Sequence, residues 1–319
     1  VETIKTGGRE RSVRQSRTRI GLLVIQAALS ALLLVGAGLF VNSLREVARI
    51  HLGYEPSRVV GATMDLRPLG YKQPDRIALF NAMRDRVAAT PGIESAAIAA
   101  MHPLSGSAFA TSFRIPGRDS LPQSPLGGPY FNRVSGDYFA TLGLRIVDGR
   151  PITSADVASD ARVVVLSESL ARAYWPNERA VGQCMILDAD STCSTVVGVA
   201  EDAKEQVTAG AARFIIYTRL GPAYDGNASV LVARANGRDA ATLVPAIRKA
   251  MQSAAPNLPY ADVRTFEQML APQTRSWRMG ATLFTLFGVL ALLIAAVGLY
   301  SAISYGVTQR RHEFASEWR

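Results

Sequence analysis

The feature that most constrains this chain is a run of 22 residues without a charged side chain, residues 20–41. At a rise of about 1.5 Å per residue, a helix of this length matches a hydrocarbon core of about 30 Å. A second uncharged run, residues 279–307, has 29 residues and is long enough to cross a bilayer with some tilt. We therefore expect two transmembrane helices, one near each end of the chain.

Two other interpretations of the first run agree less well with its sequence. A cleaved signal peptide would have a shorter apolar segment and would end in a small-residue cleavage site. A buried helix of a soluble protein would keep a polar stripe, which residues 20–41 lack. The composition also favours a membrane protein, because 48% of the residues are hydrophobic and the charged fraction is 19%, against about 25% in typical soluble domains.

The net charge of +9 is concentrated at the ends of the chain. Residues 1–19 carry six basic and two acidic side chains, and residues 308–319 carry three and two. A nucleic-acid-binding protein gathers its basic residues on one folded surface, so we expect no nucleic-acid partner. Lys and Arg favour the cytoplasmic flanks of spans. Both ends are therefore expected in the cytoplasm, and residues 42–278 in the periplasm outside a bacterial inner membrane.

The first part of the outer segment predicts a β-α-β unit. A strand pattern covers residues 59–66, a helix begins at residues 73–75 and ends at residues 90–92, and a strand follows at residues 93–100. The expected apolar face of the helix consists of Ile77, Phe80, Met83 and Val87.

The same order recurs near the end of the outer segment. Residues 229–235 predict a strand, residues 239–253 a helix, and residues 259–263 a strand. The side chains of this helix that are expected to point inward are Leu243, Ile247 and Met251. Two such units can pair into one ferredoxin-like layer, which makes the expected fold class an α+β periplasmic domain between two transmembrane α-helices.

If the two units pair, residues 108–224 form an inserted subdomain of mixed α/β structure. Its expected strands are residues 162–166, 184–187, 195–199 and 214–217. Residues 167–169 are expected to cap the helix that ends at residues 174–176. The Gly- and Pro-rich run at residues 116–129 is the predicted mobile loop.

Cys184 and Cys193 are the two cysteines of the chain. If residues 184–187 and 192–197 form a hairpin that turns at residues 188–189, the two cysteines fall opposite one another. In an oxidising periplasm a disulfide between them would contribute roughly 2 to 3 kcal/mol by the chain-entropy estimate. The alternative is a pair of reduced thiols.

Motifs for catalysis and for metal binding are absent from the sequence. It has no Gly-rich phosphate loop ending in Gly-Lys-Ser/Thr, no His-Glu-x-x-His and no Gly-x-Ser-x-Gly. His51 and His312 follow the two uncharged runs and are expected at a solvated interface, and His102 is expected in a loop. Turn chemistry explains Asp188 and Asp190 better than a calcium loop does. We therefore predict no catalytic residues, no cofactor, no metal and no enzyme activity.

Several segments resemble the MacB/FtsX-type ABC transporter permeases, and in particular the second half of the duplicated long-chain permeases of that superfamily. The resemblance is carried by residues 17–44, 134–143 (VSGDYFATLG), 148–150 (DGR), 171–176 (ARAYWP), 196–199 (VVGV) and 295–300 (AAVGLY).

This resemblance implies a permease that does not line a pore but relays ATP-driven motion of a cytoplasmic ATPase subunit to a periplasmic core domain, for export or efflux. ATP would be bound by the separate ATPase. The implied partners are the lipid bilayer, that ATPase, another permease half or protomer, and a possible periplasmic protein. The implied location is the bacterial inner membrane.

The family continues after the second span through an Arg-x-x-Glu motif into a short cytoplasmic helix and two more spans. Arg310, Arg311 and Glu313 begin this pattern and are the candidates for coupling to the ATPase, but the sequence leaves the pattern after Phe314. We therefore expect a partial permease that does not stimulate an ATPase by itself.

The expected segments are a basic tail (1–19), a first span (20–43), the first part of the β-α-β subdomain (44–107), the inserted subdomain (108–224), the second part of the β-α-β subdomain (225–272), a second span (273–307) and a short cytoplasmic tail (308–319).

The main alternative is a two-span sensor with a periplasmic ligand-binding domain. A sensor needs a long output module after its second span, and the twelve residues at 308–319 cannot supply one. A membrane-anchored enzyme is disfavoured by the missing catalytic motifs.

Overall fold

The computed structural model shows two compact units, one made of Val1–Arg49 and Thr274–Arg319 and the other of Ile50–Gln273. The residues that the structure describes are 7–64, 73–104, 109–110, 112–118, 122, 127–187, 192–204, 213–221, 229–237, 239–254, 256 and 261–316. Asp188 and Asp190, considered above for calcium, lie outside these ranges, as does much of the predicted mobile loop at residues 116–129.

The helical unit contains α1 (Gly7–Arg49) and most of α7 (Phe266–Ser316). Segments Val24–Ser43 and Phe266–Ser301 are long and apolar enough to cross a membrane, by length and composition. They overlap the two uncharged runs that predicted spans. Leu22, Leu29, Leu286 and Leu293 are all exposed, as lipid-facing side chains would be.

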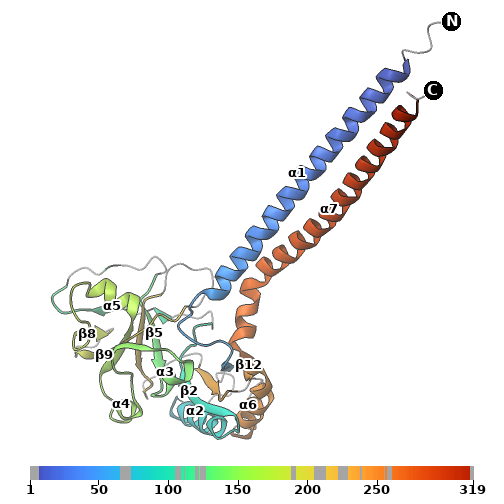
Figure 1. Ribbon diagram of the computed structural model, residues 1–319. Helices are drawn as coiled ribbons and strands as arrows, with labels where there is room; N and C mark the ends of the chain where they lie inside the picture. Colours follow the sequence, from blue (N-terminus) through green and yellow to red (C-terminus); the bar gives the residue numbers. More distant parts are fainter. Residues whose placement is uncertain are drawn as a thin grey trace. The chain divides into compact units, whose positions relative to one another are not determined.

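Glycines let α1 and α7 approach closely within the helical unit (Figure 1). A Cβ atom on Gly36 would lie 3.1 Å from the ring of Phe284, and one on Gly280 would lie 2.7 Å from the ring of Phe40. The rings of Phe40 and Phe284 stack with their centroids 5.0 Å apart. Small residues at helix contacts are typical of membrane helices, where close packing replaces the hydrophobic effect.

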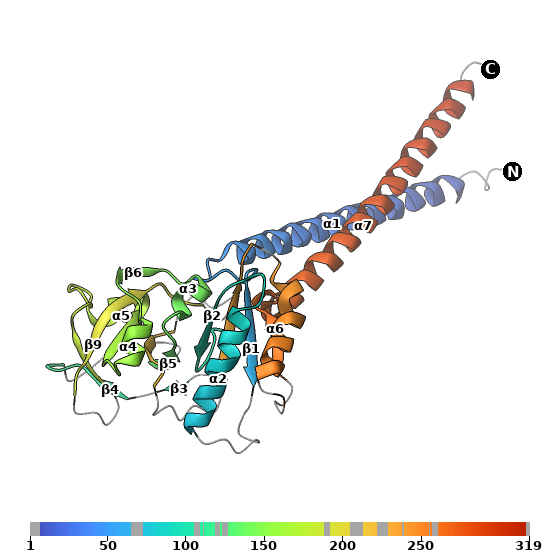
Figure 2. The same cartoon turned by 90° about the horizontal axis from the view of Figure 1, so that it is seen from below.

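The other unit begins with the expected ferredoxin-like layer. Strands β1 (Val59–Met64), β2 (Ile93–Ala99), β11 (Ser229–Ala235) and β12 (Asp262–Thr265) form a sheet in the order β12-β1-β11-β2, with every neighbouring pair antiparallel. Helices α2 (Gln73–Ala88) and α6 (Ala240–Ala254) lie side by side against it (Figure 2). The expected pairing of the two β-α-β units is confirmed.

The helices attach to this sheet through the apolar positions that their periodicity predicted. Phe80, Met83 and Val87 of α2 are buried, as are Leu243, Ile247 and Met251 of α6, whereas Ile77 is only half-buried. The last strand lies later than residues 259–263, because its pairing with β1 runs from Asp262 to Thr265.

The inserted subdomain extends the same sheet. Strand β2 pairs with β5 (Tyr130–Val134), and the order continues through β10 (Ile215–Arg219), β7 (Val163–Ser167), β9 (Ser194–Ala200) and β8 (Cys184–Leu187) to β4 (Phe113–Arg114). Strand β3 (Phe109–Ala110) pairs with β5, and β6 (Ile146–Gly149) pairs with β9. The helices of this part are α3 (Tyr138–Leu142), α4 (Ser154–Ala158) and α5 (Glu168–Tyr174). The four strands predicted here are confirmed, and β3–β6, α3 and α4 were not predicted.

The predicted cap of α5 has the expected position, but it lacks the expected side-chain hydrogen bond. Ser167 occupies the N-cap position, but its hydroxyl makes no capping hydrogen bond; it accepts instead from the backbone N–H of Ile215, at 3.0 Å. Asp202 takes over the capping role, because its carboxylate accepts from the N–H and the hydroxyl of Ser169 at 3.0 and 2.9 Å. Burial raises the pKa of this Asp202 carboxyl group.

The predicted register of the cysteine hairpin is also wrong, by two residues. Cys184 pairs with Thr195 and Met185 with Ser194, so Cys193 does not lie directly opposite Cys184. The Cα atoms of the two cysteines are nevertheless 5.5 Å apart, and the structure joins them by a disulfide. A diagonal position across a hairpin thus also brings two cysteines within bonding reach.

Candidate functional site

The sequence proposed no catalytic or metal site, and the described residues contain no cluster of three or more His, Cys, Asp or Glu side chains that could hold a metal ion. The ATPase-coupling candidates Arg310, Arg311 and Glu313 lie in the helical end of α7, but their side chains are outside the described part. The structure instead draws attention to two places in the unit Ile50–Gln273. One is the junction through which the chain enters and leaves this unit, and the other is a groove between its subdomains.

The chain enters the unit through residues 50–54, the entry segment, which hydrogen-bonds to the residues that follow β9. The backbone N–H of Lys204 donates to the carbonyl of Leu52, and the hydroxyl of Tyr54 donates to the carbonyl of Lys204, each at 2.9 Å. Between them, Gly53 has a φ of 82°, and a Cβ atom there would lie 2.3 Å from the carbonyl oxygen of Asp202. Only glycine fits this position without moving the backbone.

The carboxylate of Glu201 adds charged contacts to the entry segment. Its side chain is nearly buried, and its carboxylate accepts from the backbone N–H and the guanidinium of Arg145, at 3.3 and 3.2 Å. The same carboxylate lies 3.3 Å from Nε2 of His51. The side chain of His51 is 78% exposed, as the sequence predicted for a solvated residue. A charge-assisted cluster therefore ties the first residues of the entry segment to the inserted subdomain.

The chain leaves the unit through the first turn of α7, which is anchored in the ferredoxin-like core. Thr265 and Gln268 form reciprocal hydrogen bonds: the Thr265 hydroxyl accepts from the N–H of Gln268 at 3.2 Å, and the Gln268 side chain accepts from the N–H of Thr265 at 3.1 Å. This is a capping box, and the sequence Thr-x-x-Gln could have revealed it. Phe266 follows the cap and is fully buried.

Tyr54 and His102 both pack on Phe266. The ring of Tyr54 meets that of Phe266 edge-on, with the centroids 5.4 Å apart, and the ring of His102 lies 5.2 Å away. Burial lowers the pKa of His102 to about 4, against a smaller opposing effect of Asp262. His102 is in a loop, as predicted, but it is a neutral core residue there. Tyr54, which belongs to the entry segment, therefore contacts the residues after β9 through its hydroxyl and the exit helix through its ring.

Pro272 lies inside α7, one residue before the end of this unit. Proline has no N–H for the hydrogen bond to the carbonyl four residues earlier, and its ring crowds that carbonyl. Such positions are the usual places where helices bend.

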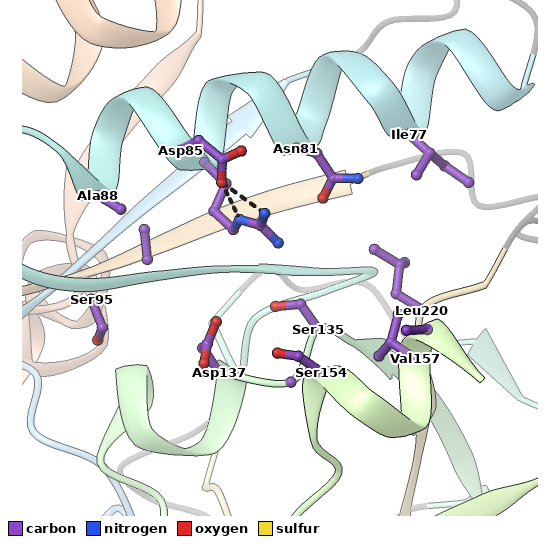
Figure 3. A pocket seen from close by; sticks show the side chains of 14 residues that line it. Ile77, Asn81, Asp85, Ala88, Ser95, Ser135, Asp137, Ser154, Val157 and Leu220 are labelled. Carbon is purple, nitrogen blue, oxygen red and sulfur yellow. Dashed lines mark hydrogen bonds and ion pairs between the residues drawn. The ribbon is translucent and has the colours of Figure 1, made fainter. Parts of the chain in front are cut away.

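The groove lies where the two subdomains meet (Figure 3). One wall is α2, the floor includes Ser95 and Ala96 of β2, and the other wall comes from the turn after β5 and from α4. Its volume is about 580 Å³, which is within the range of small-molecule sites.

Comparison with known proteins points to one family. The family model described as the MacB-like periplasmic core domain matches residues 18–250. Similar solved structures include the periplasmic region of MacB from Actinobacillus actinomycetemcomitans, at 15% identity and a TM-score of 0.48, which covers 72% of this chain and 97% of that one. Another is the extracellular domain of the noncanonic ABC-type transporter YknZ from Gram-positive bacteria, at 13% identity and a TM-score of 0.42, covering 65% and 100%. No curated protein matches the chain significantly.

Proposed function

The chain belongs to the family of MacB-like periplasmic core domains, which are parts of ABC-type transporter permeases, and from this premise we propose that it relays motion from a cytoplasmic ATPase to its periplasmic domain. The relay would serve export or efflux. In this proposal the two candidate spans lie in a bacterial inner membrane, residues 42–278 face the periplasm, and ATP is bound by a separate subunit. Another permease half or protomer and a periplasmic protein would complete the assembly.

The observation that supports the relay most directly is the double contact of Tyr54. A relay needs its incoming and outgoing helices to act on the same part of the domain, because otherwise a displacement of one would not move the other. Tyr54 satisfies this need, since it belongs to the entry segment, its hydroxyl donates to the carbonyl of Lys204 and its ring packs on Phe266 at the start of α7. A displacement of the entry segment or of the start of α7 must therefore either break these contacts or move the residues on both sides of them together.

Arg310, Arg311 and Glu313 are proposed as residues that contact the ATPase. They occupy the positions of the Arg-x-x-Glu motif, and α7 extends through them as a continuous helix. Cys184 and Cys193 are proposed to keep the β8–β9 hairpin closed, with no part in the relay.

Amide hydrogen exchange tests the relay. The full chain is reconstituted in lipid nanodiscs with the ATPase and the other permease half encoded beside its gene, and exchange of the peptide that contains Lys204 is compared without nucleotide and with a non-hydrolysable ATP analogue. We expect exchange at Lys204 to change with nucleotide, because its N–H is bonded to Leu52 in the entry segment.

Two glycine variants provide a matched pair for this experiment. Gly53 and Gly237 both have positive φ values, of 82° and 66°, so both substitutions by alanine strain the backbone, but only Gly53→Ala also presses on the carbonyl of Asp202. Gly53→Ala should abolish the nucleotide-dependent change, and Gly237→Ala should keep it. Exchange at Lys204 that is identical with and without nucleotide in the unmodified chain would refute the relay.

A further inference from the structure

We propose that the groove between α2 and α4 is a binding site for a small organic cation, an ammonium group joined to an apolar group. This inference goes beyond the relay and does not depend on it. It rests on three properties of the groove: a rigid wall, one unpaired negative charge and an apolar end.

The wall on the side of the inserted subdomain is held in place by close backbone contacts. A Cβ atom on Gly136 would lie 2.3 Å from the backbone nitrogen of Ser154, so the turn after β5 rests directly on the start of α4. Ser135 is fixed to β2 by two hydrogen bonds, because its hydroxyl accepts from the N–H of Ile98 at 3.0 Å and its N–H donates to the carbonyl of Ile98 at 2.9 Å. This wall of the groove is therefore preorganised, which reduces the cost of binding.

A second set of contacts fixes α4 itself. Thr153 and Asp156 form a capping box at its first turn, and Arg150 binds the Asp156 carboxylate through two nitrogens, at 2.7 and 2.9 Å. Hydrogen bonds from Arg150 lower the pKa of Asp156, so this carboxylate stays ionised at neutral pH. Ser154, the first residue of α4, consequently keeps its place in the wall.

The charges that line the groove leave one carboxylate without a partner. Arg84 and Asp85 neutralise each other on α2, with two nitrogens of Arg84 at 2.9 and 2.7 Å from one oxygen of Asp85. Asp137, an exposed residue on the opposite wall, forms no ion pair and no hydrogen bond through its side chain with any residue in the described ranges; it occupies the N-cap position of α3 but makes no capping hydrogen bond there. The lining therefore has a net charge of −1, which complements a single positive charge.

The remaining polar and apolar groups are arranged around this charge. Asn81 lies on α2, and Ser135, Asp137 and Ser154 lie on the opposite wall of the groove (Figure 3). Ile77, Val157 and Leu220 line the other end of the groove. An ammonium group can donate to Asp137 and to a serine oxygen while its apolar substituent covers these three side chains, which is the usual division of a small-molecule site.

Saturation-transfer NMR on the full chain in nanodiscs can test this assignment. The probes are 4-phenylbutylamine, 4-phenylbutanol and 4-phenylbutanoate, which share one apolar group and differ in charge, and signals from empty nanodiscs are subtracted. We expect the amine to bind at least fivefold more tightly than the alcohol, and the carboxylate to bind more weakly than both.

Matched variants distinguish binding in the groove from non-specific electrostatic binding of the probes. Asp137→Asn should weaken binding of the amine at least fivefold without changing that of the alcohol, whereas Asp75→Asn should change neither, because Asp75 is an exposed residue of α2 outside the lining. Val157→Ser should weaken binding of the amine and the alcohol alike. The proposal is overturned if the carboxylate binds best, if the Asp137 and Asp75 variants behave the same, or if no probe binds the chain.

Discussion

His102 should make the unit Ile50–Gln273 markedly less stable in mild acid. Its ring is 2% exposed, and its Nδ1 atom accepts a hydrogen bond from the N–H of Leu104 at 3.1 Å. Protonation would bury a positive charge and would also remove this acceptor, so burial lowers the pKa of His102 from 6.5 to about 4.

The direction of the effect follows from which state binds the proton. Between pH 6.5 and about 4 the unfolded chain is protonated at His102 and the folded chain is not, so stability is complete above pH 6.5 and falls as the pH decreases toward 4. The whole separation is worth roughly 3 kcal/mol, and the part lost between pH 7 and pH 5 is about 2 kcal/mol.

Urea unfolding of the full chain in detergent micelles can measure this loss. Trp175 is buried in the inserted subdomain and can report unfolding by fluorescence once Trp277 and Trp318 are replaced by phenylalanine. His102→Asn is the matched variant, because its side-chain oxygen can accept from Leu104 but does not titrate. The variant should lose about 2 kcal/mol less than the parent between pH 7 and pH 5. Equal losses in the two proteins would show that His102 is not the acid-sensitive group.

Three further predictions concern the hairpin, the topology and the exit helix. Mass spectrometry of unreduced peptides should find Cys184 joined to Cys193 in protein from the membrane, and reduction should lower stability by roughly 2 to 3 kcal/mol; free thiols on both would contradict the pairing. In a chain whose two native cysteines are serine, a cysteine at exposed position Ala241 should react with an impermeant thiol reagent in intact spheroplasts and one at Ser16 should not; the reverse pattern would invert the topology. Pro272→Ala should slow amide exchange around this position of α7, because it restores a backbone hydrogen bond; faster exchange would mean that the proline fits the helix without loss.

Periodicity along the sequence predicted the parts of the fold that are long enough to show it. The helix α2 has four turns, and its buried positions Phe80, Met83 and Val87 recur at helical spacing. The helices α3 and α4 have five residues each, so one turn offers no repeat that could distinguish a helix from a loop. Gly143, with a φ of 74° after α3, was the available local signal.

Tertiary contacts decided the features that the sequence predicted wrongly. Ser167 has the residue type of a helix cap, but its hydroxyl accepts a hydrogen bond from Ile215 of strand β10, which is nearly 50 positions away in the sequence. The junction was missed for a related reason. Glu201, Arg145 and His51 are far apart in the sequence, and only the fold brings them together. The capping box of Thr265 and Gln268, by contrast, is local and was readable.

The two connections of the unit Ile50–Gln273 differ in stiffness, and this difference bears on how the proposed relay would work. The entry segment is not helical and depends on a few hydrogen bonds at Leu52 and Tyr54 and on the charges of Glu201, each of which weakens steeply over a displacement of about 1 Å. The exit is a capped helix whose first side chain, Phe266, is fully buried, so the helix cannot shift without disturbing a close-packed core. Within this unit, a displacement of the first turn of α7 would therefore reach the ferredoxin-like layer with little loss, whereas a displacement of the entry segment could be absorbed by its hydrogen bonds. The start of α7 is therefore the stiffer of the two connections, and the contact of Tyr54 with Phe266 joins the stiff connection to the compliant one.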